Sequence, residues 1–184
     1  ARVAALAEKY APVAQDEGRD PGAEEAHALA RRAAESCAVL LKNEGGILPI
    51  RERAGTLLIG DMAAHPRYQG SGSSHINPRR LTSAAGACPD LAWVQGCLGD
   101  GSAPGTLIDE AVRAARTAKT AVIFAGLPPQ CESEGFDRAD MALPEGHVRL
   151  IEAVAAENPN TVVVLACGAP VELPWEGLVR GILW

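Results

Sequence analysis

The chain has 184 residues, of which 47% are hydrophobic and 22% charged, and its formal net charge is −6 at pH 7. That length allows one globular domain with a sizeable core, and the acidic balance argues against a nucleic-acid or anionic-membrane partner. No apolar run approaches the roughly 20 residues that a membrane span needs, so no membrane partner is expected.

The first 22 residues are predicted to lie outside the main fold. Residues 1–10 indicate a short helix, and residues 11–20 are polar with glycine and proline, as is typical of a linker. Asp20-Pro21 supplies an N-cap and a first-turn proline for the next element. Apolar residues then recur at helical spacing over residues 26–41, which predicts an amphipathic helix there and a domain spanning residues 23–184.

Five further segments predict the strands of a sheet. Residues 56–60, 120–127 and 161–168 are apolar on both faces, as in buried parallel strands. Residues 178–184 form a similar run, and a shorter strand is expected near residues 91–97.

Helical patterns alternate with these strands. A short helix is expected over residues 78–85, a second over residues 107–115, and a third that begins at Pro144. The alternation predicts an α/β fold: a doubly wound, mostly parallel sheet of five to six strands with helices on both faces, in a flavodoxin-like layered sandwich.

An acidic loop at residues 131–138 follows the apolar run at 120–127. In an open α/β sheet, loops that leave the carboxyl ends of strands are where ligands bind. The loop brings together a set of charged residues and a glycine: Glu132, Glu134, Gly135, Asp137 and Arg138. Gly135 allows a tight turn beside Glu134, and Asp137 and Arg138 can hold the loop through charge-assisted hydrogen bonds. A carboxyl group held in this way is a candidate general acid/base, although a solvated acidic loop without chemistry also fits these residues.

A loop rich in glycine and serine, residues 67–75, follows the first core strand. Its glycine spacing fits neither a dinucleotide fingerprint nor a P-loop. The polar and aromatic side chains in it suit a neutral polar ligand such as a sugar, which needs donors, acceptors and one ring to stack on: Arg67, Tyr68, Gln69, Ser74 and His75. A mobile loop without function is the alternative.

Other groups of residues give weaker indications of function. Ser73, Ser74 and His75 are chain neighbours, a placement that seldom permits a Ser-His-Asp triad. His27 and His147 lie on predicted helices and are expected to be surface histidines. The five cysteines form no C-x-x-C pair, so buried free thiols are expected, with no metal and no cofactor. Free thiols and the lack of a signal-peptide pattern favour a cytoplasmic location.

Taken together, these segments resemble the second, α/β-sandwich domain of glycoside hydrolase family 3. The resemblance covers residues 24–184, and the motifs that carry it occur in the family's order at residues 30–49, 67–75, 132–144 and 162–175. The sequence departs from the family pattern at Gly60-Asp61-Met62, where many members have Gly-Pro-Asn, and at His147, where glutamine is frequent.

The resemblance implies the acid/base half of a retaining, exo-acting β-glycosidase of the β-glucosidase or β-xylosidase type. In this family the general acid/base is the glutamate of a Glu-Gly-aromatic-Asp-Arg motif, which is Glu134 rather than Glu132 here. The nucleophile is an aspartate of an N-terminal TIM-like barrel. Residues 1–22 resemble the end of that barrel and the linker. The expected partners are therefore the barrel of the same polypeptide and a β-linked glycoside.

Retaining hydrolysis needs two carboxyl groups about 5–5.5 Å apart. The chain is expected to be a fragment that holds one of them, and to be inactive alone. Two alternatives remain at this point. One is a non-catalytic sugar-binding or structural accessory domain of the same fold, and the other is an independent flavodoxin-like domain that binds a phosphorylated cofactor.

Overall fold

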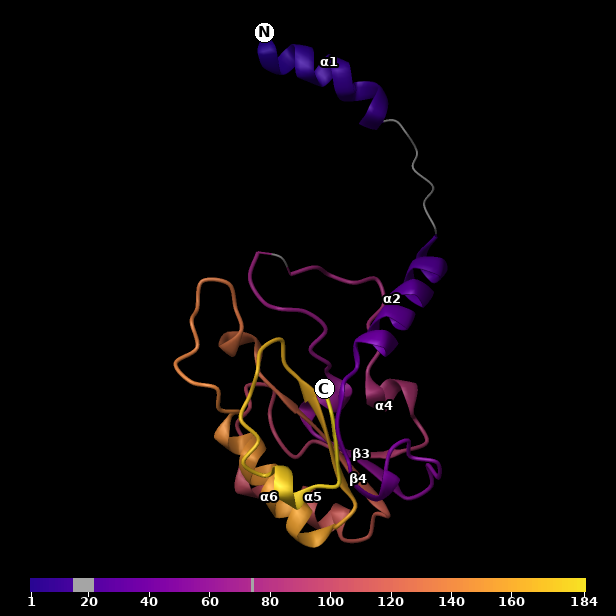
Figure 1. Ribbon diagram of the computed structural model, residues 1–184, viewed down its shortest axis with the longest axis vertical. Helices are drawn as coiled ribbons and strands as arrows, with labels where there is room; N and C mark the ends of the chain where they lie inside the picture. Colours follow the sequence, from indigo (N-terminus) through magenta and orange to yellow (C-terminus); the bar gives the residue numbers. More distant parts are fainter. Residues whose placement is uncertain (15–21, 74) are drawn as a thin grey trace. The chain divides into compact units, whose positions relative to one another are not determined.

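The computed structural model of the protein describes residues 1–14, 22–73 and 75–184 (Figure 1). These residues fall into two compact units, Ala1–Ala38 and Val39–Trp184. Part of the predicted linker and the predicted ligand-binding residue Ser74 lie outside the described residues. The domain boundary expected between residues 22 and 23 stays a prediction.

The first unit consists of two helices, α1 (Arg2–Ala14) and α2 (Ala23–Cys37). The periodicity of residues 26–41 correctly predicted α2 as far as Cys37 but was wrong beyond it. Leu40 belongs instead to strand β1 (Leu40–Asn43), where it pairs with Leu183. Backbone pairing across the sheet overrides the local helical pattern, as tertiary context commonly does. No helix in the described residues is long and apolar enough to cross a membrane.

The second unit is built on a six-stranded, mostly parallel sheet with the order β1-β6-β5-β4-β2-β3. Only β1 runs antiparallel, along the edge next to β6. The remaining strands are β2 (Thr56–Ile59), β3 (Ala92–Val94), β4 (Thr120–Gly126), β5 (Thr161–Ala166) and β6 (Gly181–Leu183). The predicted doubly wound α/β sandwich is confirmed. The strands expected at 91–97 and 178–184 are shorter than predicted.

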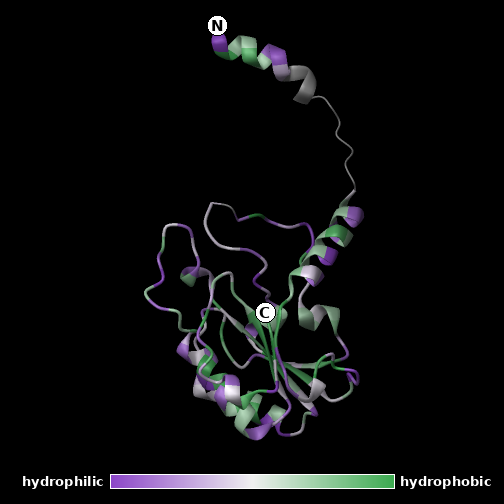
Figure 2. Cartoon of the chain, in the orientation of Figure 1, coloured by the Kyte–Doolittle hydropathy of each residue, from purple (hydrophilic) through white to green (hydrophobic). Residues whose placement is uncertain are grey.

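Alternate residues of each central strand enter two different cores. Along β4, Ile123 packs with the cluster under helices α5 and α6, whereas Val122 packs with the cluster on the other face. Val163 and Val162 of β5 divide in the same way. Successive strand side chains point to opposite faces, so a strand that is apolar at every position can fill both cores. Figure 2 shows these strands as predominantly hydrophobic.

Helices α5 (Gly105–Ala115) and α6 (Glu145–Glu157) pack against each other and cover one face of the sheet. His147 in α6 is only 1% exposed, so the expectation of a surface histidine was wrong. Its Nδ1 atom lies 3.0 Å from the Gly126 carbonyl oxygen at the end of β4. Burial lowers the pKa of His147, which favours the neutral ring.

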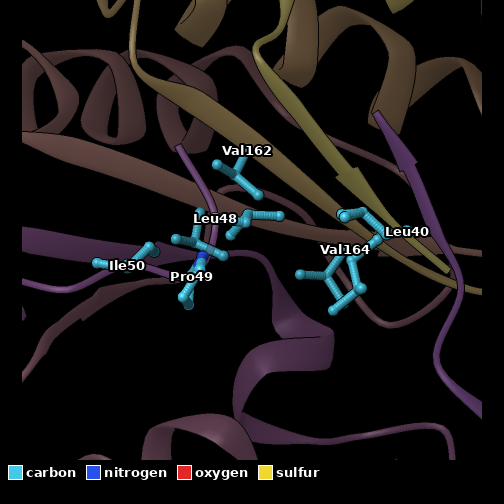
Figure 3. Close-up of a pocket in the computed structure, with 8 residues that line it drawn as sticks. Leu40, Leu48, Pro49, Ile50, Val162 and Val164 are labelled. Carbon is cyan, nitrogen blue, oxygen red and sulfur yellow. The ribbon is translucent and has the colours of Figure 1, made fainter. Parts of the chain in front are cut away.

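The other face carries two short helices, α3 (Asp61–Ala64) and α4 (Ala84–Ala87), and the segment around Pro49. Helix α4 begins after the N-cap Ser83, whose hydroxyl accepts a bond from Gly86 N–H, so the helix predicted at 78–85 lies too early. An open apolar hollow of about 500 Å³ remains on this face (Figure 3). It is lined by side chains of β1, β4, β5, β6 and residues 48–50, all of them apolar. It therefore offers a sugar no side-chain hydrogen-bonding group.

We predict that the central strand limits stability. Ile123→Ala removes a side chain that is 0% exposed and should lower the free energy of unfolding by about 3 kcal/mol, as cavity-creating changes do. The matched control Ile76→Ala, at a side chain 61% exposed, should cost less than about 1 kcal/mol. Urea denaturation measures both, and equal losses would contradict the assigned core.

Candidate active site

The predicted site lies at the carboxyl edge of the parallel strands. The segment after β2 contains residues 67–73, the one after β4 contains residues 127–138, and Gly168 follows β5. Residues 71 and 133 form an isolated parallel bridge, so the first two loops are joined by backbone pairing. The glycine- and serine-rich loop and the acidic loop thus form one structure, although about 60 residues of chain separate them.

An ion pair between Arg67 and Glu132 also joins the two loops. Both side chains are only 11% exposed. The guanidinium also donates to the Leu127 carbonyl oxygen at 2.6 Å, and the Glu132 carboxylate accepts the Gly168 N–H at 3.0 Å. The Arg67–Glu132 clamp, as we call this group, therefore connects the loops that follow β2, β4 and β5.

Glu134 lies two residues further on and is exposed. Its carboxylate oxygen Oε2 accepts the Ser73 main-chain N–H at 2.8 Å and also the Ser73 hydroxyl. Its own N–H donates to the Ser71 carbonyl oxygen at 3.3 Å. The Ser73 hydroxyl and then the Ser73 N–H lower the pKa of Glu134, because both stabilise the anion. In this domain the group is held as a carboxylate at neutral pH.

Two glycines give the loops the backbone conformation that this contact needs. At Gly72, φ is +105°, and an added Cβ would lie 2.5 Å from the Glu134 Cβ. At Gly135, φ is +82°, in the left-handed region that favours glycine, as predicted for a tight turn beside Glu134. Any side chain at position 72 would therefore push the two loops apart.

The other predicted sugar-binding side chains largely organise their own loop. The Tyr68 hydroxyl donates to the Ile76 carbonyl oxygen at 2.8 Å and lies 3.1 Å from His75 Nε2. The Gln69 side-chain oxygen accepts the Ile76 N–H at 3.1 Å. These three side chains and Arg67 nevertheless line a cavity of about 180 Å³, so the structure brings them together. Their role in sugar binding stays a prediction.

Arg138 supports the acidic loop through backbone carbonyls. Its guanidinium donates to Pro170 O at 3.1 Å and to Ala142 O at 3.5 Å. Asp137 is exposed, and Phe136 beside it is 71% exposed. The predicted supporting role therefore has a physical basis for Arg138, through contacts outside the loop itself.

Sequence reasoning missed two further features of this edge. Ser73 was considered only as a triad member, whereas the structure makes it the partner of Glu134. Asp61 and His65 form a side-chain contact of 3.0 Å, and both residues line the same cavity. Their spacing of four residues was the available signal, since i,i+4 side chains meet on one helical turn. The described residues contain no cluster of three side chains suited to a metal ion.

Comparison with known proteins agrees with this architecture. The family model for the glycosyl hydrolase family 3 C-terminal domain matches residues 38–184. Thermostable beta-glucosidase B of Acetivibrio thermocellus is 48% identical over 165 residues, which cover 85% of this chain and 22% of that protein. An exo-alpha-(1->6)-L-arabinopyranosidase of Bifidobacterium breve is 39% identical, over 84% of this chain and 22% of that protein.

A solved structure extends the match to three dimensions. The family 3 beta-glucosidase of Bifidobacterium adolescentis superposes with a TM-score of 0.89 and 39% identity. The superposition covers 98% of this chain and 27% of that one. The chain therefore spans about a quarter of the length of the relatives it resembles.

The Arg67–Glu132 clamp should contribute more to stability than an exposed ion pair does. Arg67→Ala leaves the Glu132 carboxylate nearly buried without its cation, which should lower the free energy of unfolding by roughly 3 kcal/mol. The control Arg31→Ala removes a pair whose side chains are 75% and 59% exposed, and should cost less than about 1 kcal/mol. Urea denaturation measures both changes, and a negligible effect of Arg67→Ala would refute the structural role of the clamp.

Proposed function

The chain belongs to glycoside hydrolase family 3, whose C-terminal domain it forms, and we propose that it supplies the general acid/base of a retaining, exo-acting β-glycosidase. Glu134 is the proposed acid/base. The nucleophile is assigned to an aspartate on an N-terminal barrel of the full-length enzyme. The proposed substrate is a β-linked glucoside or xyloside, a class supported by the beta-glucosidases among the relatives.

The different surroundings of the two glutamates carry this proposal. Glu132 is 11% exposed in its side chain, and its oxygens bind Arg67 and the Gly168 N–H. A carboxylate committed in this way cannot approach a glycosidic oxygen without breaking the clamp. Glu134 is exposed on the same loop, and its bonds to Ser73 fix its direction. A general acid/base must come within hydrogen-bond reach of the proton it transfers, which favours Glu134.

The proposed reaction has two steps. In the first, the barrel aspartate attacks the anomeric carbon, the glycosidic bond breaks, and Glu134 gives its proton to the departing oxygen. In the second, the Glu134 carboxylate takes a proton from water, and the water oxygen displaces the aspartate from the anomeric carbon. The second step regenerates both carboxyl groups. Because the first step needs the aspartate, the chain alone should hydrolyse nothing.

The lowered pKa of Glu134 suits the second of these steps. In the domain alone, the Ser73 hydroxyl and N–H favour the carboxylate, which is the form that activates water. The first step needs the protonated form. A nucleophile carboxylate about 5–5.5 Å away would raise the pKa of Glu134 through like-charge repulsion. Once the sugar esterifies the nucleophile, that repulsion disappears and Glu134 returns to its ionised form.

We predict that azide accelerates the full-length Glu134→Ala enzyme. The leaving group of an activated substrate such as a dinitrophenyl glycoside departs without a proton. Hydrolysis of the glycosyl-enzyme therefore limits the rate of this variant, and both kcat and KM should fall. Azide needs no base, can enter the vacated space and should raise kcat at least tenfold, with a β-glycosyl azide as product. Steady-state kinetics and product analysis measure this.

The matched control is Glu132→Ala in the same enzyme. It removes the carboxylate of the clamp but keeps the Glu134 carboxyl, so azide should neither accelerate it nor yield a glycosyl azide. Rescue of the Glu132 variant, with none for the Glu134 variant, would contradict the proposal and assign the acid/base to Glu132.

A further inference from the structure

We propose that Ser73 is a positioning residue for Glu134, whose main-chain N–H and hydroxyl together orient the carboxyl group and hold it as an anion. The inference rests on the proposed function for its catalytic meaning, because it explains how the base form of Glu134 is prepared. The contact between Ser73 and Glu134 involves only residues of this chain, so it can be tested without enzymatic turnover.

The contact is built by three separate features of the two loops. Both Ser73 donors reach the same oxygen, Oε2 of Glu134. The Glu134 N–H is fixed in turn by the Ser71 carbonyl oxygen at 3.3 Å. Gly72 lies between these two serines and, with φ of +105°, allows the loop to approach the Glu134 Cβ. Glu134 is thus held at its main-chain N–H and at one carboxylate oxygen, which leaves Oε1 to face the substrate.

The two donors of Ser73 have different chemical capacities. A main-chain N–H can only donate, whereas a hydroxyl can donate to a carboxylate or accept from a carboxylic acid. The hydroxyl can therefore stay bonded to Glu134 in both protonation states by rotating about its Cβ–Oγ bond. This property suits a group that alternates between acid and base, and it assigns the serine side chain a role that alanine cannot fill.

The basic side chains in the described part of the two loops bind other groups. Arg67 pairs with Glu132, and the His75 ring lies 3.1 Å from the Tyr68 hydroxyl. Arg138 binds the Pro170 carbonyl oxygen, and Asp137, on the same loop, would disfavour rather than stabilise a second anion. The Ser73 hydroxyl is accordingly the first cause of the lowered pKa of Glu134, and the Ser73 main-chain N–H is the second.

The test is a carboxyl-carbon NMR titration of Glu134 in the 184-residue chain. Ser73→Ala should move the midpoint of Glu134 upward, because one anion-stabilising donor is lost. Ser73→Thr keeps the hydroxyl and should restore the original midpoint. The matched control Ser71→Ala should leave it unchanged, since Ser71 uses its main-chain carbonyl. Amide spectra of each variant report whether the loops keep their fold.

A second variant separates the hydroxyl from the loop geometry. Gly72→Ala keeps Ser73 but should displace it from Glu134, and should also raise the midpoint. An unchanged midpoint in a folded Ser73→Ala protein would overturn the inference, as would an equal shift in Ser71→Ala. These results are independent of azide rescue, so the inference can fail while Glu134 remains the acid/base, and the reverse also holds.

Discussion

The Arg67–Glu132 ion pair is the constraint on which the proposed site depends. Three loops leave the carboxyl edge of the sheet after β2, β4 and β5, and loops of this kind have no regular hydrogen-bond ladder to fix them. The clamp replaces that ladder: Arg67 bonds the acidic loop at Glu132 and at Leu127 O, and Glu132 bonds Gly168. With the loops held in this way, the bridge between residues 71 and 133 and the Ser73–Glu134 contact can form.

This arrangement gives two glutamates of one loop different chemistry. Glu132 is nearly enclosed and neutralised by a cation, so its role is to hold the loops together. Glu134 is exposed and is bonded by neutral donors, which orient it and leave it open to a proton. The two side chains lie in different environments although only Ser133 separates them in the chain. The proposed barrel would complete the site from outside this domain.

Much of the fold could be predicted from the sequence because its strands are apolar at every position. Residues 120–127 and 161–168 fill two cores at once, as is typical of strands in a buried parallel sheet. The loop with Glu134 and the turn at Gly135 were likewise predicted from local residue types. The contacts between residues far apart in the chain could not be predicted in this way. Nothing near Arg67 indicates that its guanidinium binds Glu132, and β1 has the periodicity of the helix before it. His147 is a polar residue and was expected at the surface, but its position on α6 buries it.

The central claim is that Glu134, and not Glu132, transfers the proton. A series of aryl glycosides whose leaving groups span a wide range of pKa tests it most directly in the full-length enzyme. For Glu134→Gln, the loss of kcat/KM relative to wild type should increase steadily as the leaving group becomes more basic, because only poor leaving groups need the proton. For Glu132→Gln the loss should be the same across the series. A constant loss for Glu134→Gln, with a graded one for Glu132→Gln, would contradict the assignment.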